Sequence, residues 1–229
     1  MSAIASSLQA VRRRIATAAQ DFGRSPREIS LLAVSKTWPV DCVLEANRAG
    51  QRLFGENYVQ EGVAKVLATA GLGLEWHFIG PLQSNKTRLV AEHFSWVHSI
   101  ERLKVAERLS AQRPEDLPPL SVCIEVNVSG AATKSGCTPE EALELCQAVS
   151  GLPRLKLRGL MAIPDAVDDF AAQRVPFRRL RELGEQIHAA GLPFDTLSMG
   201  MSHDLEAAVA EGATIVRIGT AIFGERGHA

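Results

Sequence analysis

The sequence predicts an α/β fold, a single (β/α)8 barrel of the TIM type with an extra N-terminal helix. Short aliphatic segments alternate with helical patterns, giving about eight β-α units, the number that closes a parallel barrel. Glycines follow most of the helical patterns, as expected of C-terminal helix caps in short connections. The length of 229 residues is also ordinary for such a barrel. We therefore expect one domain spanning 1–229.

The expected elements follow from the periodicity of apolar residues. An amphipathic helix is expected over about 6–22, where Leu8, Val11 and Ile15 share one face and the arginines lie mainly on the other. Buried strands are expected from short, aliphatic, partly β-branched runs at 31–35, 52–55, 75–79, 96–99, 120–126, 155–160, 194–198 and 214–218. Helices are expected between them at 40–49, 58–70, 86–92, 102–112, 139–150, 168–190 and 205–211.

An open, doubly wound sheet is the alternative arrangement of the same elements. Such a sheet usually carries a glycine-rich phosphate loop after its first strand. Here that position holds Lys36-Thr37-Trp38-Pro39, which favours the barrel. The proline-rich segment 113–119 is expected to be a surface connection on the far side from the functional site.

Charge and composition exclude several classes of function. The net charge of −1 provides no field for nucleic acid or anionic lipid. The four cysteines form no C-x-x-C pair and no metal-ligand spacing, so we expect no metal site. No signal peptide is apparent, and no apolar run approaches the roughly 20 residues of a membrane span. We expect a soluble, cytoplasmic protein.

Lys36 is the residue whose side chain is best placed to take part in a reaction. It closes the first strand, and barrels place their chemistry at the carboxyl ends of strands. A desolvated primary amine at that position can attack an aldehyde. The alternative is a lysine that extends from the strand end into water.

Two adjacent strand ends predict an anion site. Ser198-Met199-Gly200-Met201-Ser202 runs into a helix, and Gly219-Thr220 follows the last strand. Phosphate sites in barrels frequently form after strands seven and eight. Taken singly, Ser202 could be only a helix N-cap and Gly219 only a turn residue. Together they favour a phosphate ligand.

Arg217 is a charge inside an apolar strand. Alternation points it into the barrel, opposite to Val216 and Ile218. Buried arginine needs a partner, which is either a structural carboxylate or a ring nitrogen of a bound cofactor. A Schiff-base lysine, a phosphate cradle and a partner for a pyridine nitrogen are the parts that a pyridoxal 5′-phosphate (PLP) site requires.

With these residues the chain resembles the PLP homeostasis proteins, single-domain relatives of the alanine racemase N-terminal barrel. The match runs from Leu31 to Gly224. Its most specific parts are Trp76-His77-Phe78-Ile79-Gly80-Pro81-Leu82-Gln83-Ser84-Asn85-Lys86 and Ser198-Met199-Gly200-Met201-Ser202. It also includes Ala33-Val34-Ser35-Lys36-Thr37, Phe54-Gly55-Glu56-Asn57-Tyr58-Val59-Gln60-Glu61, Gly159-Leu160-Met161, Val216-Arg217-Ile218-Gly219-Thr220 and Ile222-Phe223-Gly224.

The resemblance implies a role for each site residue. Lys36 would hold PLP as a Schiff base, and Arg217 would face the pyridine nitrogen. The phosphate would be held by Ser202, Gly219 and Thr220, with Ser198 and Gly200 shaping the loop. Asn57 would bind the cofactor from the rim of the site. His77 and Asn85 would lie at the rim of the site, although His77 could equally be a core histidine and Asn85 could simply begin a helix.

Two positions depart from the family pattern. Trp38 stands where many relatives carry a second basic residue, so a relay of the cofactor through a neighbouring lysine is not expected. The loop 127–136 has alanines at positions that are often acidic in relatives, and its Lys134 is expected to be a solvated charge.

The function implied is that of a non-catalytic carrier and buffer of PLP in intracellular vitamin B6 and amino-acid homeostasis, with apo-PLP enzymes as possible recipients. Racemases of this type take a second acid/base from a C-terminal domain that we expect to be absent here. A weak PLP-dependent amino-acid racemase, or a cofactor-free Schiff-base aldolase acting through Lys36, are the alternatives.

Overall fold

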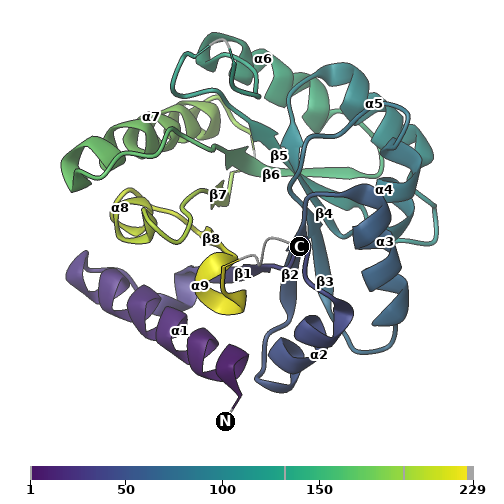
Figure 1. Ribbon diagram of the computed structural model, residues 1–229. Helices are drawn as coiled ribbons and strands as arrows, with labels where there is room; N and C mark the ends of the chain where they lie inside the picture. The colour runs from purple at the N-terminus through teal and green to yellow at the C-terminus, as the bar shows by residue number, and fades with distance from the viewer. Residues whose placement is uncertain (1, 132, 193, 226–229) are drawn as a thin grey trace.

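The protein is a closed barrel of eight parallel strands surrounded by helices, as predicted (Figure 1). The computed structural model describes residues 2–131, 133–192 and 194–225. The ends of the predicted domain span 1–229 therefore lie outside the described residues. Ala132, in the predicted loop 127–136, also lies outside them. The strands are β1 Ser30–Val34, β2 Leu53–Glu56, β3 Glu75–Phe78, β4 Trp96–Ile100, β5 Leu120–Glu125, β6 Leu155–Met161, β7 Thr196–Ser198 and β8 Ile215–Ile218, paired in chain order with β8 closing onto β1.

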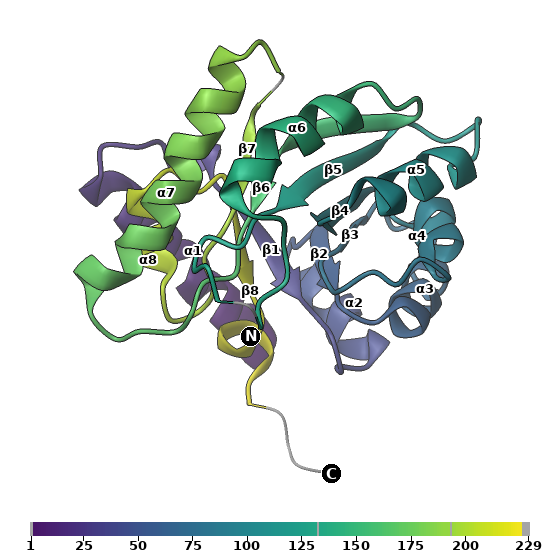
Figure 2. The same ribbon diagram turned by 90° about the horizontal axis from the view of Figure 1, so that it is seen from above.

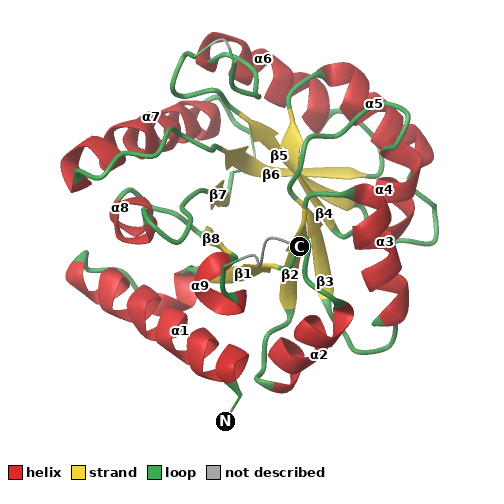
Figure 3. Ribbon diagram, viewed as in Figure 1, coloured by secondary structure: helices red, strands yellow, loops and turns green. Residues whose placement is uncertain are grey.

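Helices form the outer layer, and Figure 3 shows them as a ring outside the strands. Their bounds are α1 Ala3–Asp21, α2 Val40–Arg48, α3 Val59–Ala68, α4 Thr87–His93, α5 Leu103–Gln112, α6 Pro139–Ser150, α7 Phe170–Ala189, α8 Leu205–Ala210 and α9 Thr220–Phe223, with a 3₁₀ turn η1 at Pro26–Glu28. Helix α1 packs on α8 and α9, and α7 packs on α8, so these helices lie together on one side of the barrel (Figure 2). Within the described residues, no helix combines the length and apolarity that a membrane crossing needs.

The barrel has an inner and an outer apolar layer because strand side chains alternate. Val216 and Ile218 belong to the outer core between sheet and helices, whereas Ile215 belongs to the inner core. The inner core is made of Leu32, Val34, Ile79, Trp96, Cys123, Met161 and Ile215. Arg217 alternates in the same way as Ile215, and this places its guanidinium inside the barrel.

Most expected elements differ from the observed ones by one to three residues at an end, and two short elements were not predicted. Strand β7 begins at Thr196, because Phe194 turns outward and packs on Gly184 of α7. Helix α7 begins at Phe170, with Asp169 as its side-chain cap. The turns η1 and α9 are too short to show helical periodicity in the sequence.

The proline-rich segment 113–119 lies at the amino-terminal end of β5, away from the carboxyl ends of the strands. It is anchored by Arg113, whose buried guanidinium donates hydrogen bonds to the carbonyl oxygens of Ala91, Phe94 and Pro118. The segment is therefore a fixed connection rather than a loose loop.

Candidate functional site

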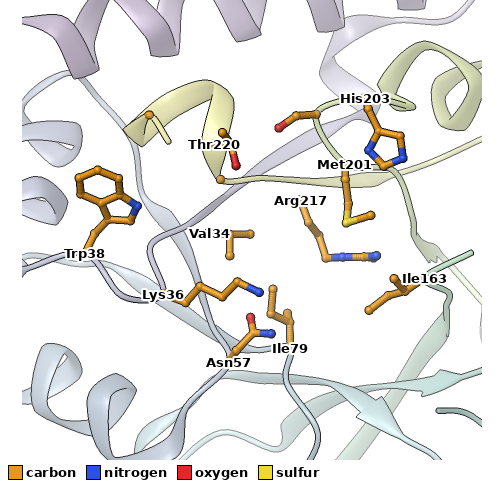
Figure 4. A pocket seen from close by; sticks show the side chains of 13 residues that line it. Val34, Lys36, Trp38, Asn57, Ile79, Ile163, Met201, His203, Arg217 and Thr220 are labelled. Carbon is orange, nitrogen blue, oxygen red and sulfur yellow. The ribbon is translucent and has the colours of Figure 1, made fainter. Parts of the chain in front are cut away.

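A cavity of about 240 Å³ opens at the carboxyl ends of the strands (Figure 4). It combines one amine, one guanidinium, hydroxyl groups and an apolar wall. Its lining residues are Val34, Lys36, Trp38, Asn57, Ile79, Ile163, Met201, Ser202, His203, Arg217, Gly219, Thr220 and Gly224.

Lys36 is presented to this cavity by a tight turn after β1. Ser35 is fully buried, with its amide bonded to the carbonyl oxygen of Gly55 and its hydroxyl donating to Glu56 Oε1 at 2.7 Å. The next residue, Thr37, has a left-handed φ of 68°, and its amide donates to the carboxylate of Glu61. The turn is therefore held on both sides of Lys36, whose amine points into the cavity beside Asn57 (Figure 4).

A buried ionic cluster supports this turn from behind. Lys65 Nζ lies 2.7 Å from Glu56 Oε1, 2.7 Å from Glu61 Oε1 and 2.7 Å from the carbonyl oxygen of Ser35. Burial raises the pKa of the Glu56 carboxyl, and hydrogen bonds from Lys65 and Ser35 oppose that effect. The cluster fixes the ends of β1 and β2 relative to each other.

Asn57 supplies a buried acceptor to the cavity. Its Oδ1 has no hydrogen-bond partner within the described part of the chain. A Cβ on Gly80 would lie 2.2 Å from the carbonyl oxygen of Asn57, so this position after β3 tolerates only glycine. Buried polar atoms are normally satisfied, and this orphaned oxygen indicates a missing ligand.

The loops after β7 and β8 bring two hydroxyl groups to the same wall. Gly200 has a φ of 93°, and its carbonyl oxygen accepts a hydrogen bond from the amide of Arg217 at 2.9 Å. Arg14 of α1 donates to the carbonyl oxygen of Ser202 at 3.1 and 3.2 Å. These contacts fix the loop that brings Ser202 to the cavity, which Thr220 also lines.

Arg217 is the buried charge of the site. It is 4% exposed, and it donates from Nη1 to the carbonyl oxygen and hydroxyl of Ser198, at 2.6 and 2.8 Å, and from Nη2 to the carbonyl oxygen of Ala162 at 2.9 Å. Burial lowers the pKa of Arg217 to about 10, against the attraction of Glu125 and Asp204. The guanidinium is thus still charged at neutral pH.

The structure brings most of the predicted site residues together. Lys36, Asn57, Ser202, Arg217, Gly219 and Thr220 line the cavity. Ser198 lies behind Arg217, and Gly200 forms the turn. His77 is fully buried in the barrel, and Asn85 is exposed in the turn before α4; neither belongs to the lining.

The sequence reasoning did not assign several residues that form the site. Ile79, Ile163 and Met201 supply an apolar wall, and His203 stands beside them. Ile79 and Met201 lie in the motifs that carry the resemblance, whereas Ile163 gives no sequence signal. Lys134 pairs with Asp165 at 2.9 Å, and its side chain is 31% exposed.

Comparison with known proteins places this fold and site in one class. The family model "Alanine racemase, N-terminal domain" matches residues 6–227, and the chain belongs to this family. Among its members, pyridoxal phosphate homeostasis proteins are the named relatives of this chain. The protein of that name from Pseudomonas aeruginosa is 60% identical over 228 residues, covering 100% of this chain and 98% of the relative. The one from Escherichia coli is 55% identical over 231 residues, covering 100% and 99%. The predicted family is confirmed.

Solved structures agree with this placement. PipY of Synechococcus elongatus, solved with PLP bound, matches with a TM-score of 0.83 and 37% identity, covering 96% of this chain and 100% of that one. A protein of unknown function from Bifidobacterium adolescentis matches with a TM-score of 0.90 and 36% identity, covering 96% and 94%. D-threonine aldolase from Filomicrobium marinum, at 16% identity and a TM-score of 0.75, covers 96% and 60% and shares the fold alone.

Proposed function

We propose that this chain, as a single barrel domain, binds PLP in the cavity and carries and buffers it through a Schiff base on Lys36. The observation that carries the proposal is the convergence of an amine, a buried guanidinium and two hydroxyl groups on one cavity. The PLP-bound PipY structure supports it, as do the names of the relatives.

The residues present fit the cofactor. When bound, PLP supplies an aldehyde for the amine, a phosphate and an aromatic ring that withdraws electrons. Ser202 and Thr220 would hold the phosphate, and Gly219 lets β8 end close to β1, where a Cβ would lie 3.2 Å from the carbonyl oxygen of Val34. The orphaned Oδ1 of Asn57 gains a partner when the cavity is filled.

Arg217 determines what the bound ring can do. A guanidinium donates hydrogen bonds and accepts no proton, so Arg217 leaves the ring nitrogen unprotonated. The ring is then a weaker electron sink than one paired with a carboxylate. This favours storage of the cofactor over transamination.

The first test is titration of ligand-free protein with PLP, followed by absorbance. Wild type and Lys104→Ala, which replaces an exposed lysine of α5, are expected to give the same saturable spectral change. Lys36→Ala is expected to lack that change. Equal spectra for wild type and Lys36→Ala contradict the proposal.

A weak amino-acid racemase is the second candidate, and His203 is the observation in its favour. His203 is the histidine that lines the cavity among the residues described, and histidine is the side chain most often used in general acid–base catalysis. Two-base racemisation needs such a partner. The candidate predicts loss of α-deuterium from amino acids at about 1 s⁻¹ or faster, and loss in His203→Ala; release at background rate in wild type eliminates it.

We also propose a cytoplasmic location and delivery of the cofactor to apo-PLP enzymes. The naming of the relatives as homeostasis proteins supports this role. Loaded protein mixed with an apo-enzyme is expected to restore that enzyme's activity faster than PLP leaves the carrier alone. Equal rates mean that the recipient simply captures free PLP.

A further inference from the structure

A chain of hydrogen bonds crosses the inside of the barrel behind the site. Arg217 Nη1 lies 2.8 Å from Ser198 Oγ, and Ser198 Oγ lies 2.8 Å from His98 Nδ1. His98 Nε2 lies 2.9 Å from His77 Nδ1, and His77 Nε2 lies 2.9 Å from Glu75 Oε1. The two histidines and Ser198 are fully buried, whereas the Glu75 side chain is 46% exposed. The chain therefore runs from the cavity to the amino-terminal end of β3.

The two ends fix the direction of every hydrogen bond. Arg217 can only donate, so Ser198 Oγ accepts from it. The Glu75 carboxylate can only accept, and with neutral histidines this orients every other bond, so that Ser198 Oγ gives its hydrogen to His98 Nδ1. His98 then carries its proton on Nε2 and donates to His77, and His77 carries its proton on Nε2 and donates to the Glu75 carboxylate. Both histidines are neutral in this arrangement.

A charged histidine breaks the arrangement. A proton on His98 Nδ1 would give Ser198 Oγ two donors and leave the serine hydrogen without an acceptor in the chain. The electrostatic surroundings also favour neutral histidines. Burial lowers the pKa of His77, and the charge of Arg158 lowers it further, while Glu75 opposes the shift. Burial lowers the pKa of His98, and the charge of Arg217 adds to this effect. The neighbouring His77 lowers the pKa of His98 further.

The hydrogen-bond chain is important for holding Arg217 in place, because the residues described include no carboxylate within hydrogen-bond distance of its guanidinium. Glu125 and Asp204 act on it only through longer-range attraction. Ser198 supplies two of its three acceptors, the carbonyl oxygen and the hydroxyl. Because His98 takes the serine hydrogen, Oγ is held with its lone pairs toward Arg217, and bonds in such a chain strengthen one another.

We infer that His98 and Ser198 are positioning residues, which lock the Arg217 guanidinium against the barrel wall so that its remaining N–H groups face the cavity. His77 and Glu75 complete the chain and fix the tautomer of His98. The inference rests on the proposed function, since Arg217 is assigned there to the cofactor ring.

The direct test is nitrogen NMR of the ligand-free protein. Histidine-labelled protein is expected to show His77 and His98 as Nε2–H tautomers that do not titrate between about pH 5.5 and 8. Ser198→Ala is expected to shift the His98 Nδ1 signal and to change the Arg217 side-chain N–H signals, while the fold is retained. A proton on His98 Nδ1 in wild type, or Arg217 signals unchanged in Ser198→Ala, overturns the inference.

A second test uses PLP affinity. His98→Leu removes both hydrogen bonds and is expected to weaken PLP binding roughly tenfold, which corresponds to about 1.4 kcal/mol. His98→Gln, which can still accept and donate, is expected to recover most of that loss, whereas exposed His188→Leu has no effect. Equal losses in His98→Leu and His98→Gln overturn the positioning role. Failure of the wild-type protein to bind PLP refutes the proposed function instead. The NMR result alone then tests whether the hydrogen-bond chain positions Arg217.

Discussion

For single residues, the chemistry of the cavity depends on which donors and acceptors have no partner in the protein and are therefore available to a ligand. Arg217 donates two hydrogen bonds from Nη1 and one from Nη2 to protein acceptors. The Oδ1 atom of Asn57 has no hydrogen-bond partner in the described part of the chain. Ser202 and Thr220 contribute hydroxyl groups to the same cavity. Under the proposed function the amine, the guanidinium and the hydroxyl groups would contact different parts of PLP, so substitutions should separate their roles.

Lys36→Ala is expected to abolish covalent attachment and to leave weak, reversible binding by the phosphate site. Because the remaining contacts persist, we expect affinity to fall by roughly 10- to 100-fold, about 1.4 kcal/mol per factor of ten. Equilibrium dialysis with Lys104→Ala as control measures the change. Complete loss of binding in a folded Lys36→Ala protein would show that the phosphate site holds nothing by itself.

Ser202→Ala and Thr220→Val are expected to discriminate between PLP and pyridoxal. A hydrogen bond to a charged group contributes about 1.5–3 kcal/mol, so each variant should lose about 10- to 100-fold in PLP affinity. Pyridoxal, which lacks the phosphate, should bind wild type and variants equally. A matching loss for both ligands places the phosphate elsewhere.

At the element scale, the site depends on where strands end and how closely they pack. A Cβ on Gly159 of β6 would lie 1.9 Å from the carbonyl oxygen of Thr196 in β7. Ala162 follows β6 and Ser198 ends β7, and the carbonyl oxygens of both accept hydrogen bonds from Arg217. The spacing of β6 and β7 therefore bears on both stability and the site.

Gly159→Ala is expected to destabilise the protein by about 3 kcal/mol or more, because strand backbone must move to admit the methyl group. Gly151→Ala is the matched control. Gly151 follows α6 with a φ of −83°, and its added Cβ would meet nothing closer than 3.7 Å, so its effect should stay within about 0.5 kcal/mol. Urea unfolding of both variants measures the difference; similar values contradict this packing.

The strands and long helices could be predicted because burial imposes clear periods on their sequences. The end of β1 could be predicted from Lys36, and the inward-facing side of β8 from Arg217, because both residues interrupt apolar runs. His98 gave the same signal inside β4, but its partners come from β3 and β7, and only the closed barrel brings them together. Lys65 lies on the buried face of α3, where its pairing with Glu56 depends on tertiary packing.

At the scale of the whole molecule, buried ionisable groups couple stability to pH. Glu125, at the end of β5, is 6% exposed, and burial together with the charge of Glu101 raises its pKa to about 7, although Arg217 opposes the shift. Between the ordinary carboxyl pKa of 4.5 and this value, the folded state binds more protons than the unfolded state. Stability should therefore fall as pH rises through this window.

Glu125→Gln is expected to remove that fall, because an amide does not titrate. From pH 5 to pH 8 the variant should gain up to about 3 kcal/mol of unfolding free energy relative to wild type, at about 1.4 kcal/mol per pKa unit. Glu115→Gln, at a carboxylate whose side chain is 88% exposed, should follow wild type. Parallel pH profiles for all three proteins would show that Glu125 titrates normally.

The proposed function depends on covalent attachment of PLP to Lys36. The most direct measurement is borohydride reduction of PLP-loaded protein, followed by peptide mapping with mass spectrometry. We predict a single pyridoxyl group on the peptide containing Lys36, with loss of the visible absorbance. An unmodified Lys36 peptide, a pyridoxyl group on another lysine, or a sugar adduct in place of the pyridoxyl group would contradict the proposal.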